Sequence, residues 1–361
     1  MCLSKFGKEL LSSKGKLEQY DLNNIVQLFR KDEDQHATFS SSQYYEVDKL
    51  IDLLKDHKHN FTTLTLNIEE LNTKYNELLA FVKLLDAENI HISAILLQET
   101  MLSDSDCEEN NIKIFDIPNY NLIPMGRKCG RKGGLAIYLH NDYEAKRKNL
   151  YKQSEHWEGM FIDVTSDYLP KKIILGNVYR PPRDNYSDVS IDRFLEPMTQ
   201  ILKKIHKEKC AAQIGGDYNI NLLRLNEREK FQQYFDYFVT QDLFPQITLP
   251  TRFSKNNATL IDQLFCRFSK YESHCASGII LRKISDHLPC FTSMNIHGLK
   301  EPIPKFVKIR DSGPQSLETF VTEVHKNMDD SLFDFGETTD PNVNYGTLEN
   351  IIKTAREKSF P

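Results

Sequence analysis

The sequence predicts an α/β (α+β) protein with two packed sheets and helices on their outer faces. Short apolar runs, typical of buried strands, alternate along the chain with longer segments in which apolar residues recur at helical spacing. With 361 residues and a hydrophobic content of 40%, the chain is long enough to bury one large core and to carry extensions. We therefore expect one globular domain flanked by smaller segments.

The first 60 residues are predicted to form a polar extension that contains an amphipathic helix. Between residues 44 and 54, Val47, Leu50, Ile51 and Leu54 fall on one helical face. This helix could pack against the domain or bind a partner, and packing is the favoured interpretation.

The domain itself is predicted to span residues 61 to 297. Its strands are expected at residues 61–66, 93–97, 135–139, 160–164, 173–179, 211–215, 260–265 and 290–295. Its helices are expected at residues 75–88, 191–207 and 228–239, where apolar residues follow a helical period. Pro181 and Pro182 should end the strand before them, because proline lacks the N–H that a strand ladder needs. Residues 251–257 should form a hairpin-like loop.

Acidic and amide side chains follow two of these strands at the point where each ends. Glu99 comes just after the strand at 93–97. After the strand at 211–215, two glycines at 215 and 216 allow a tight turn or a close backbone approach. Asp217 and Asn219 then follow two residues apart, so their side chains could share one face of an extended chain.

A third acidic residue, Asp262, lies inside an apolar segment. Burial of its carboxylate without a partner would be costly, and His287 in the sequence Ser285-Asp286-His287 is a candidate partner. Each motif alone is more often a strand end or a turn. Together they supply what metal-assisted hydrolysis of a phosphodiester needs: a carboxylate for a hard cation, a base for water and neutral donors for a phosphate.

These motifs resemble those of the endonuclease/exonuclease/phosphatase superfamily, and most closely the endonuclease domain of LINE-type non-LTR retrotransposons. The resemblance covers roughly residues 42 to 296 and rests on residues 66–72, 97–100, 133–138, 177–182, 215–219, 251–252, 258–262 and 285–289. The segments at 179–182, 251–252 and 258–262 favour the retroelement branch over the phosphatases. The implied fold is a four-layered sandwich of two packed, mostly antiparallel sheets flanked by helices, as in deoxyribonuclease I.

The resemblance also implies roles for individual side chains. Glu99 would bind the metal, with Asn67 and Asp286 as further metal ligands. Asp217 would orient or deprotonate the attacking water, and His287, held by Asp262, would contact the phosphate. The implied catalytic set is Asn67, Glu99, Tyr179, Asp217, Asn219, Asp262, Asp286 and His287.

The implied activity is nicking of target DNA to leave a 3′ hydroxyl, as target-primed retrotransposition requires. The cofactor would be Mg²⁺, with Mn²⁺ as an alternative, and the partner would be DNA. Three alternatives remain: an inactive or domesticated relic that acts by binding, an abasic-site endonuclease, and a phosphomonoesterase. The acidic pair Glu69 and Glu70, near the expected DNA path, favours the first of these.

The charge of the chain gives no general support for nucleic-acid binding, because the formal net charge is −5. Two short basic segments, at 127–132 and 146–148, are local exceptions, although such runs are usually solvated loops. The candidate DNA contacts are Arg127, Lys128, Arg131, Arg180, Arg252 and Lys255.

The segment from 298 to 361 is predicted to be a linker followed by helices at 317–327 and 345–358. The resemblance implies a connector toward a reverse transcriptase, which the sequence does not contain, so that domain or element RNA is an expected partner in an intact element. A DNA substrate implies a nuclear location, with the cytoplasm as an alternative.

Seven scattered cysteines, an odd number without a Cys-x-x-Cys pair, predict reduced thiols and no structural zinc site. No apolar run approaches the ~20 residues that cross a bilayer, which predicts a soluble protein without a membrane partner.

Overall fold

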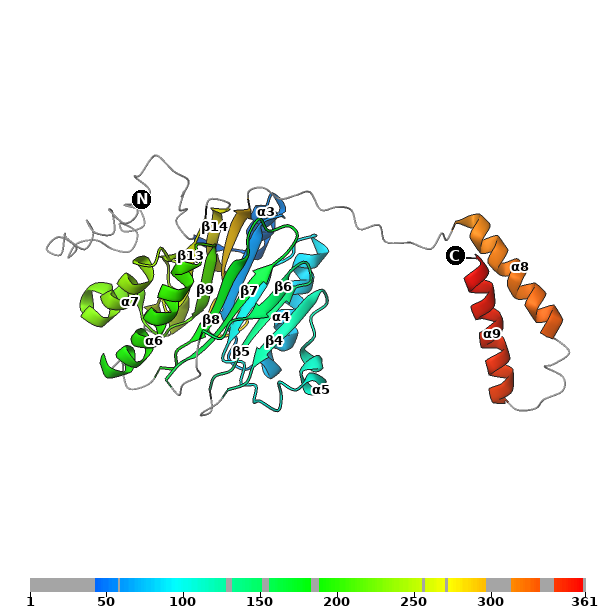
Figure 1. The fold of residues 1–361 in the computed structure, drawn as a ribbon, viewed down its shortest axis with the longest axis horizontal. Coiled ribbons are helices and arrows are strands. Elements are labelled where there is room, and N and C mark those ends of the chain that lie inside the picture. The colour runs from blue at the N-terminus through cyan, green and yellow to red at the C-terminus, as the bar shows by residue number, and fades with distance from the viewer. Residues whose placement is uncertain are drawn as a thin grey trace. The chain divides into compact units, whose positions relative to one another are not determined.

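A computed structural model describes residues 43–57, 59–127, 132–150, 156–182, 188–254, 257–269, 272–296, 313–331 and 341–359. The chain divides into two compact units, Met1–Glu301 and Pro302–Pro361 (Figure 1). Three of the predicted DNA contacts, Lys128, Arg131 and Lys255, lie outside the described residues.

The first unit contains two large sheets. One has seven strands in the order β1 (Gln43–Tyr45), β14 (Glu272–Ile280), β15 (Cys290–Ile296), β2 (Phe61–Asn67), β3 (Ala94–Gln98), β5 (Leu135–His140) and β4 (Tyr120–Met125). The other has six strands in the order β10 (Phe244–Pro245), β13 (Asp262–Arg267), β9 (Ala212–Asp217), β8 (Ile173–Tyr179), β7 (Glu158–Thr165) and β6 (Glu144–Arg147). Pairing is parallel between β1 and β14, β2 and β3, and β8 and β9, and antiparallel between the other neighbours.

Helices cover the outer face of each sheet. α3 (Val47–Lys55) and α4 (Leu71–Ala87) bury their apolar side chains against the seven-stranded sheet. α6 (Asp188–Lys207) and α7 (Glu229–Val239) lie on the six-stranded sheet (Figure 1). Shorter elements are α5 (Glu109–Ile112), the 3-10 helices Lys113–Phe115 and Leu222–Glu227, and a hairpin of β11 (Arg252–Ser254) and β12 (Asn257–Thr259). The four-layered sandwich predicted from the sequence is confirmed.

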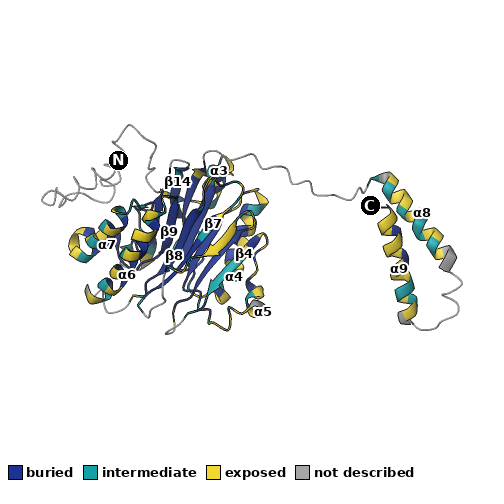
Figure 2. Cartoon of the chain, in the orientation of Figure 1, coloured by how far each residue is buried: buried dark blue, intermediate teal, exposed yellow. Residues whose placement is uncertain are grey.

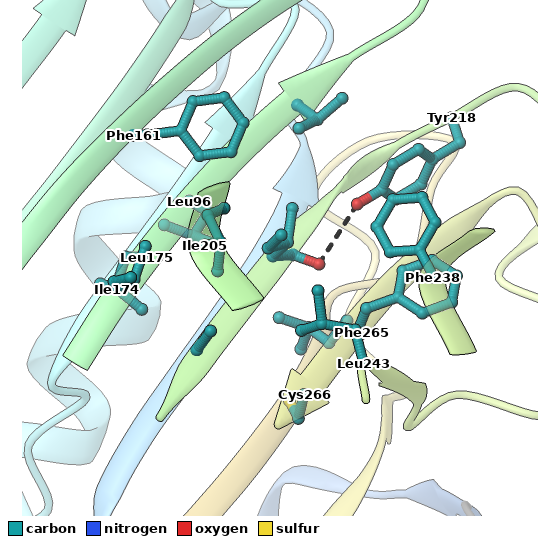
Figure 3. Packing of buried hydrophobic residues seen from close by; sticks show 14 of the residues in the cluster. Leu96, Phe161, Ile174, Leu175, Ile205, Tyr218, Phe238, Leu243, Phe265 and Cys266 are labelled. Atoms are coloured by element: carbon teal, nitrogen blue, oxygen red, sulfur yellow. Dashed lines mark hydrogen bonds between the residues drawn. The ribbon is translucent and has the colours of Figure 1, made fainter. Parts of the chain in front are cut away.

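The core lies between the sheets and under the helices, where the central strands are almost wholly buried (Figure 2). Because successive residues of β3 point to opposite faces, Leu96 enters the cluster between the sheets, whereas Ile95 and Leu97 contact the helical layer. On the other side of the six-stranded sheet, Tyr218 packs among aromatic rings and donates a hydrogen bond of 3.2 Å to the Ile214 carbonyl (Figure 3).

A buried polar link joins the sheets where β3 ends. The Gln98 amide donates to the Asn177 side chain at 2.6 Å, and Asn177 donates to the carbonyls of Leu97 and Ala136 at 2.9 and 3.0 Å. The side-chain amides of Gln98 and Asn177 both have hydrogen-bond partners on the opposite sheet, and Gln98 also bonds Thr65 on the neighbouring strand. The link therefore fixes the end of β3, from which the chain continues to Glu99.

The predicted start of the domain at residue 61 is wrong. Gln43–Tyr45 pair as an edge strand with β14, and α3 buries Leu50, Ile51 and Leu54 in the core. Residues 43–57 therefore belong to the first unit, because the apolar face of the helix packs on the sheet rather than on a partner. The predicted strand at 260–265 also differs, since β12 ends at Thr259 and β13 begins at Asp262.

The second unit is a pair of packed helices, α8 (Pro314–Ser331) and α9 (Pro341–Ser359). They contain the two predicted helical segments. Ile351 and Ala355 are buried in the pair, and the Lys358 ammonium lies 2.9 Å from the Glu323 carboxylate. Within the described residues, no helix combines the length and the apolar character needed to cross a membrane. The five described cysteines, Cys107, Cys210, Cys266, Cys275 and Cys290, are free thiols.

Candidate functional site

Strand register brings the predicted site residues to one end of both sheets. In the six-stranded sheet, Tyr179 pairs with Asp217, and Asp217 pairs with Asp262, so three adjacent strands present them side by side. In the facing sheet, Asn67 ends β2 beside the last residue of β3, and Glu99 follows at once. The pocket is therefore built from the strand ends of both layers.

Gly216 sets the position of Asp217. Its φ is +154°, and a Cβ added there would lie 1.8 Å from the carbonyl oxygen of Val178 on the neighbouring strand. Only glycine allows this close approach of β9 to β8. The glycine pair that the sequence singled out therefore serves strand packing just before the acidic residue.

Glu99 lies in a strained loop that the segment at 133–134 holds in place. Its φ is +50°, in the left-handed region. The amides of Thr100 and Met101 donate to the carbonyls of Gly134 and Gly133 at 3.1 and 2.8 Å. The carboxylate is buried, and its Oε1 accepts a hydrogen bond from Asn67 at 2.9 Å, whereas Oε2 accepts none among the described residues.

Asn67 connects the two acidic residues of the pocket. Its amide nitrogen donates to Glu99 and to Asp217, each at 2.9 Å, and its amide oxygen accepts from the backbone of Glu69 at 3.1 Å. The Ser285 hydroxyl donates to the Asn67 carbonyl at 2.6 Å, which ties the Ser285-Asp286-His287 turn to β2. Asn67 thus orients both carboxylates, and its predicted role as a metal ligand is compatible with the contact to Glu69, because an amide oxygen has two lone pairs.

Asp217 is fully buried among hydrogen-bond donors. Asn219 donates to it from its backbone at 2.9 Å and from its side chain at 3.1 Å. The same Asn219 amide donates to the carbonyl of Arg180 at 2.8 Å, so both of its hydrogens are used within the protein. Burial and the Asp262 carboxylate raise the pKa of Asp217 to about 7, although His287 and Asn67 oppose the rise.

His287 and Asp262 form a buried pair. The imidazole Nδ1 lies 2.9 Å from both carboxylate oxygens, and the Thr251 hydroxyl donates to Asp262 at 2.6 Å. Burial lowers the pKa of His287, but Asp262, with smaller contributions from Asp217 and Asp286, raises it to about 9. The imidazole is therefore a cation at neutral pH and can stabilise negative charge in the pocket.

Asp286 and Arg252 lie at the rim. The Arg252 guanidinium contacts one Asp286 oxygen at 2.8 and 2.6 Å, and the other oxygen lies 3.6 Å from Nε2 of His287. Asp286 thus shares its charge between two cations. Arg252 itself is held beside the pocket by a backbone bridge between β11 and His287.

The Tyr179 hydroxyl is buried, with no hydrogen-bond partner of good geometry among the described residues. Burial and the carboxylates of Glu99 and Asp217 raise the pKa of this phenol far above its usual value. It is therefore a neutral phenol beside the two carboxylates.

Arg180, one of the predicted DNA contacts, is buried and bonded within the protein. Only 1% of the residue is exposed, and its guanidinium donates to the carbonyls of Tyr218 and Asn219 at 3.4 and 3.3 Å and to the Ser190 hydroxyl at 3.1 Å. It shapes the loop that carries Asn219. Arg127 is partly exposed, and its backbone amide donates to the carbonyl of Leu102 at 2.8 Å.

Lys132 was noted in the sequence only as part of the basic segment at 127–132, and Glu158, which holds Gly134, was not noted. Lys132 lines the pocket, and its ammonium lies 3.1 Å from Oε2 of Glu99. Glu158 is buried at the start of β7 and accepts a hydrogen bond of 2.7 Å from the amide of Gly134. The pocket, of about 90 Å³, is lined by Asn67, Glu69, Glu99, Lys132, Pro182, Asp217, Asn219, Arg252, Asp286 and His287.

The donor atoms of the pocket fit a hard divalent cation at Glu99. Its Oε2 is buried, accepts no hydrogen bond within the described part of the chain, and already faces a cationic group, the Lys132 ammonium. A second group, Asp217, Asp262 and His287, places one potential ligand atom each within 4.8 Å of the others. In that group Asp262 and the Nδ1 of His287 are bonded to each other, so the pair fits charge stabilisation better than metal binding.

Comparison with solved structures gives many matches. An AP endonuclease, LMAP from Leishmania major, aligns over 65% of this chain and 88% of its own, with a TM-score of 0.51 and 16% identity. The two chains share a fold. The deoxyribonuclease I-like architecture predicted from the resemblance to the endonuclease/exonuclease/phosphatase superfamily is thereby confirmed at the level of the fold.

Two further matches have lower scores. The endonuclease domain of TRAS1, a telomere-specific non-LTR retrotransposon, covers 66% of this chain and 99% of its own at 14% identity and a TM-score of 0.47. The 3′ phosphatase NExo from Neisseria, bound to a product DNA hairpin, covers 65% and 99% at 16% identity and a TM-score of 0.47. No family model and no curated protein sequence matches the chain.

Proposed function

We propose that the protein is a metal-dependent phosphodiesterase that cuts the backbone of DNA. The observation that carries this proposal is the composition of one pocket. It contains a buried carboxylate at Glu99 whose Oε2 faces the Lys132 ammonium, a second carboxylate oriented by two amides at Asp217, and a charged imidazole at His287. Hydrolysis of a phosphodiester needs a cation site, a base for water and a group that stabilises the developing charge.

Each side chain has a role in this proposal. Glu99 holds the cation, Mg²⁺ or alternatively Mn²⁺, which when bound stabilises charge on the leaving oxygen. Asp217 accepts a proton from the attacking water, and Asn67 and Asn219 orient its carboxylate. The imidazolium of His287 contacts a phosphate oxygen. Tyr179, whose neutral hydroxyl lies beside the carboxylates of Glu99 and Asp217, donates to another phosphate oxygen.

DNA is the substrate that we favour. The pocket opens beside the partly exposed Arg252, which could contact a neighbouring phosphate if it leaves Asp286. We further propose that cleavage nicks one strand and leaves a 3′ hydroxyl that can prime reverse transcription. The unit Pro302–Pro361 would then lead to a reverse transcriptase domain or contact element RNA, and the reaction would take place in the nucleus.

A comparison of substrates tests this proposal. Duplex DNA, duplex DNA with an abasic site, and inositol phosphates would each be incubated with the protein and Mg²⁺. We expect cleavage of intact duplex DNA, with product ends that a DNA polymerase extends without further treatment. Cleavage confined to the abasic duplex, or release of phosphate from the inositol phosphates alone, would reassign the substrate. Absence of metal-dependent turnover on all three would favour a relic that acts by binding.

A further inference from the structure

Lys132 is the unexpected member of the pocket. Its side chain is 54% exposed, yet its ammonium lies 3.1 Å from Oε2 of Glu99, a side chain that is only 5% exposed. A buried carboxylate requires a compensating charge. Among the described residues, Lys132 is the only cation recorded against this oxygen.

The backbone that carries Lys132 is firmly positioned. Gly133 and Gly134 accept hydrogen bonds from the loop after Glu99, and Glu158 accepts one from the amide of Gly134. Gly134 has a φ of +86°, and a Cβ there would lie 2.5 Å from the Thr100 hydroxyl, so this close contact requires glycine. The backbone next to Lys132 is therefore fixed beside Glu99, while the four-carbon side chain of Lys132 can change its conformation at the rim of the pocket.

A divalent cation and the Lys132 ammonium compete for Oε2 of Glu99. Mg²⁺ binds carboxylate oxygens at about 2.0–2.1 Å. A cation bound to Oε2 in this way would repel an ammonium that lies 3.1 Å from the same oxygen. We propose that Lys132 neutralises Glu99 in the metal-free protein, that the metal displaces it, and that the released ammonium then binds a phosphate of the substrate. This inference rests on the proposed function.

The released ammonium would lie close to the other cationic side chains of the pocket. Lys132 lines the same small pocket as His287 and Arg252, which are the other cationic side chains there. A phosphate held in the pocket would meet all three groups. Because the Lys132 side chain is largely exposed, its ammonium can stay hydrated when it leaves Glu99. The metal then pairs with the Glu99 carboxylate, so no buried charge is left without a partner.

The test measures metal binding and DNA binding separately, on the full-length chain. Mg²⁺ and Mn²⁺ affinities would be measured by isothermal titration calorimetry for the wild type, Lys132→Met and Lys132→Arg. Because Lys132→Met removes the competitor, it should tighten metal binding by about threefold or more, a size typical of a partly exposed ion pair. Lys132→Arg should remain close to the wild type. At saturating metal, Lys132→Met should raise the KM for duplex DNA more than it lowers kcat.

Two controls separate this inference from a structural effect. Lys55→Met breaks a surface ion pair with Glu88, 2.8 Å long and outside the pocket, and should change neither affinity. In a Glu99→Gln background, Lys132→Met should no longer tighten metal binding, because the shared oxygen has lost its charge.

Unchanged or weaker metal binding in a folded Lys132→Met protein would overturn the inference, as would tightening that persists in the Glu99→Gln background. These outcomes differ from failure of the proposed function. In that case the wild type would bind metal without cleaving DNA, and the calorimetric comparison would still give an answer on the exchange at Glu99.

Discussion

The charge of His287 depends mainly on one partner. Asp262 contacts its Nδ1 through both oxygens and is itself fixed by the Thr251 hydroxyl. The sequence predicted this pair, because an acidic residue inside an apolar segment needs a partner. Sequence could not show that Thr251 completes the arrangement, because Thr251 reaches Asp262 only through the fold of the hairpin that follows it.

We expect His287 in the metal-free protein to titrate near pH 9, since Asp262 stabilises its charged form more than burial opposes it. In Asp262→Asn the pKa of His287 should fall toward the ordinary value of about 6.5 or below, because burial lowers this pKa and the Asp262 charge no longer raises it. Titration of the imidazole resonances by NMR measures both values. An unaltered pKa in a folded variant would show that the charge has another source.

Among the strands, those with a strong pattern of apolar residues were predicted from the sequence, and those with a weak pattern were not. Strands β2, β3, β5, β7, β8 and β15 were predicted within a few residues, because each contains several apolar or β-branched residues and nearly all of their residues are buried. By contrast, β6 is exposed along its whole length and has the sequence Glu-Ala-Lys-Arg, so no periodicity reveals it. The edge strand β1 has three residues and forms only because β14 lies beside it.

Gly216, which is tightly packed against the neighbouring strand, and Gly346, which has open space around it, test whether strand packing positions the site. Gly216→Ala should destabilise the first unit by about 3 kcal/mol or more, because its Cβ would overlap the Val178 carbonyl. Gly346→Ala, with no atom within 4 Å, should stabilise α9 by about 0.5–1 kcal/mol. Denaturant unfolding followed by circular dichroism measures both. Equal effects would contradict the packing account of Gly216.

A ring of charges links β7 to the end of α6, far along the strands from the pocket. Lys148 lies 2.9 Å from Asp163 and 2.7 Å from Glu208, and Lys172 lies 3.1 Å from Asp163. Burial raises the pKa values of Asp163 and Glu208, but the two lysines lower them overall. Carboxylates with lowered pKa values stabilise the fold above their unfolded values of about 4, and this contribution is lost as the pH falls through the folded values.

Stability should therefore decline as the solution is acidified below about pH 4.5. Asp163→Asn should reduce the free energy of unfolding at pH 7 by roughly 1 kcal/mol and flatten this acid-side decline. Urea unfolding at several pH values gives the comparison. A variant with the full acid-side slope of the wild type would exclude the ring as its cause.

For the whole molecule, the pocket belongs to the first unit alone. All the described pocket residues lie between Asn67 and His287, and the second unit begins at Pro302. The sequence predicted the two-helix tail and its separation by a change in composition. It could not show that residues 43–57 join the core or that Arg180 is buried, because both follow from contacts between distant segments.

Removal of residues 302–361 should accordingly leave the rate of metal-dependent cleavage unchanged, because no described pocket residue is lost. The check is kcat on a duplex oligonucleotide for the full and shortened chains, with circular dichroism to confirm folding. A large fall in kcat for a folded, shortened chain would mean that the second unit contributes to the chemistry.

We propose that the pocket at the strand ends is the centre of a metal-dependent DNA endonuclease. The most direct measurement is conversion of supercoiled plasmid to open circles by the purified protein, with Mg²⁺ or with a chelator, beside Asp217→Asn. We expect nicking that requires both the metal and Asp217. Nicking by a folded Asp217→Asn protein, or equal nicking without metal, would contradict it.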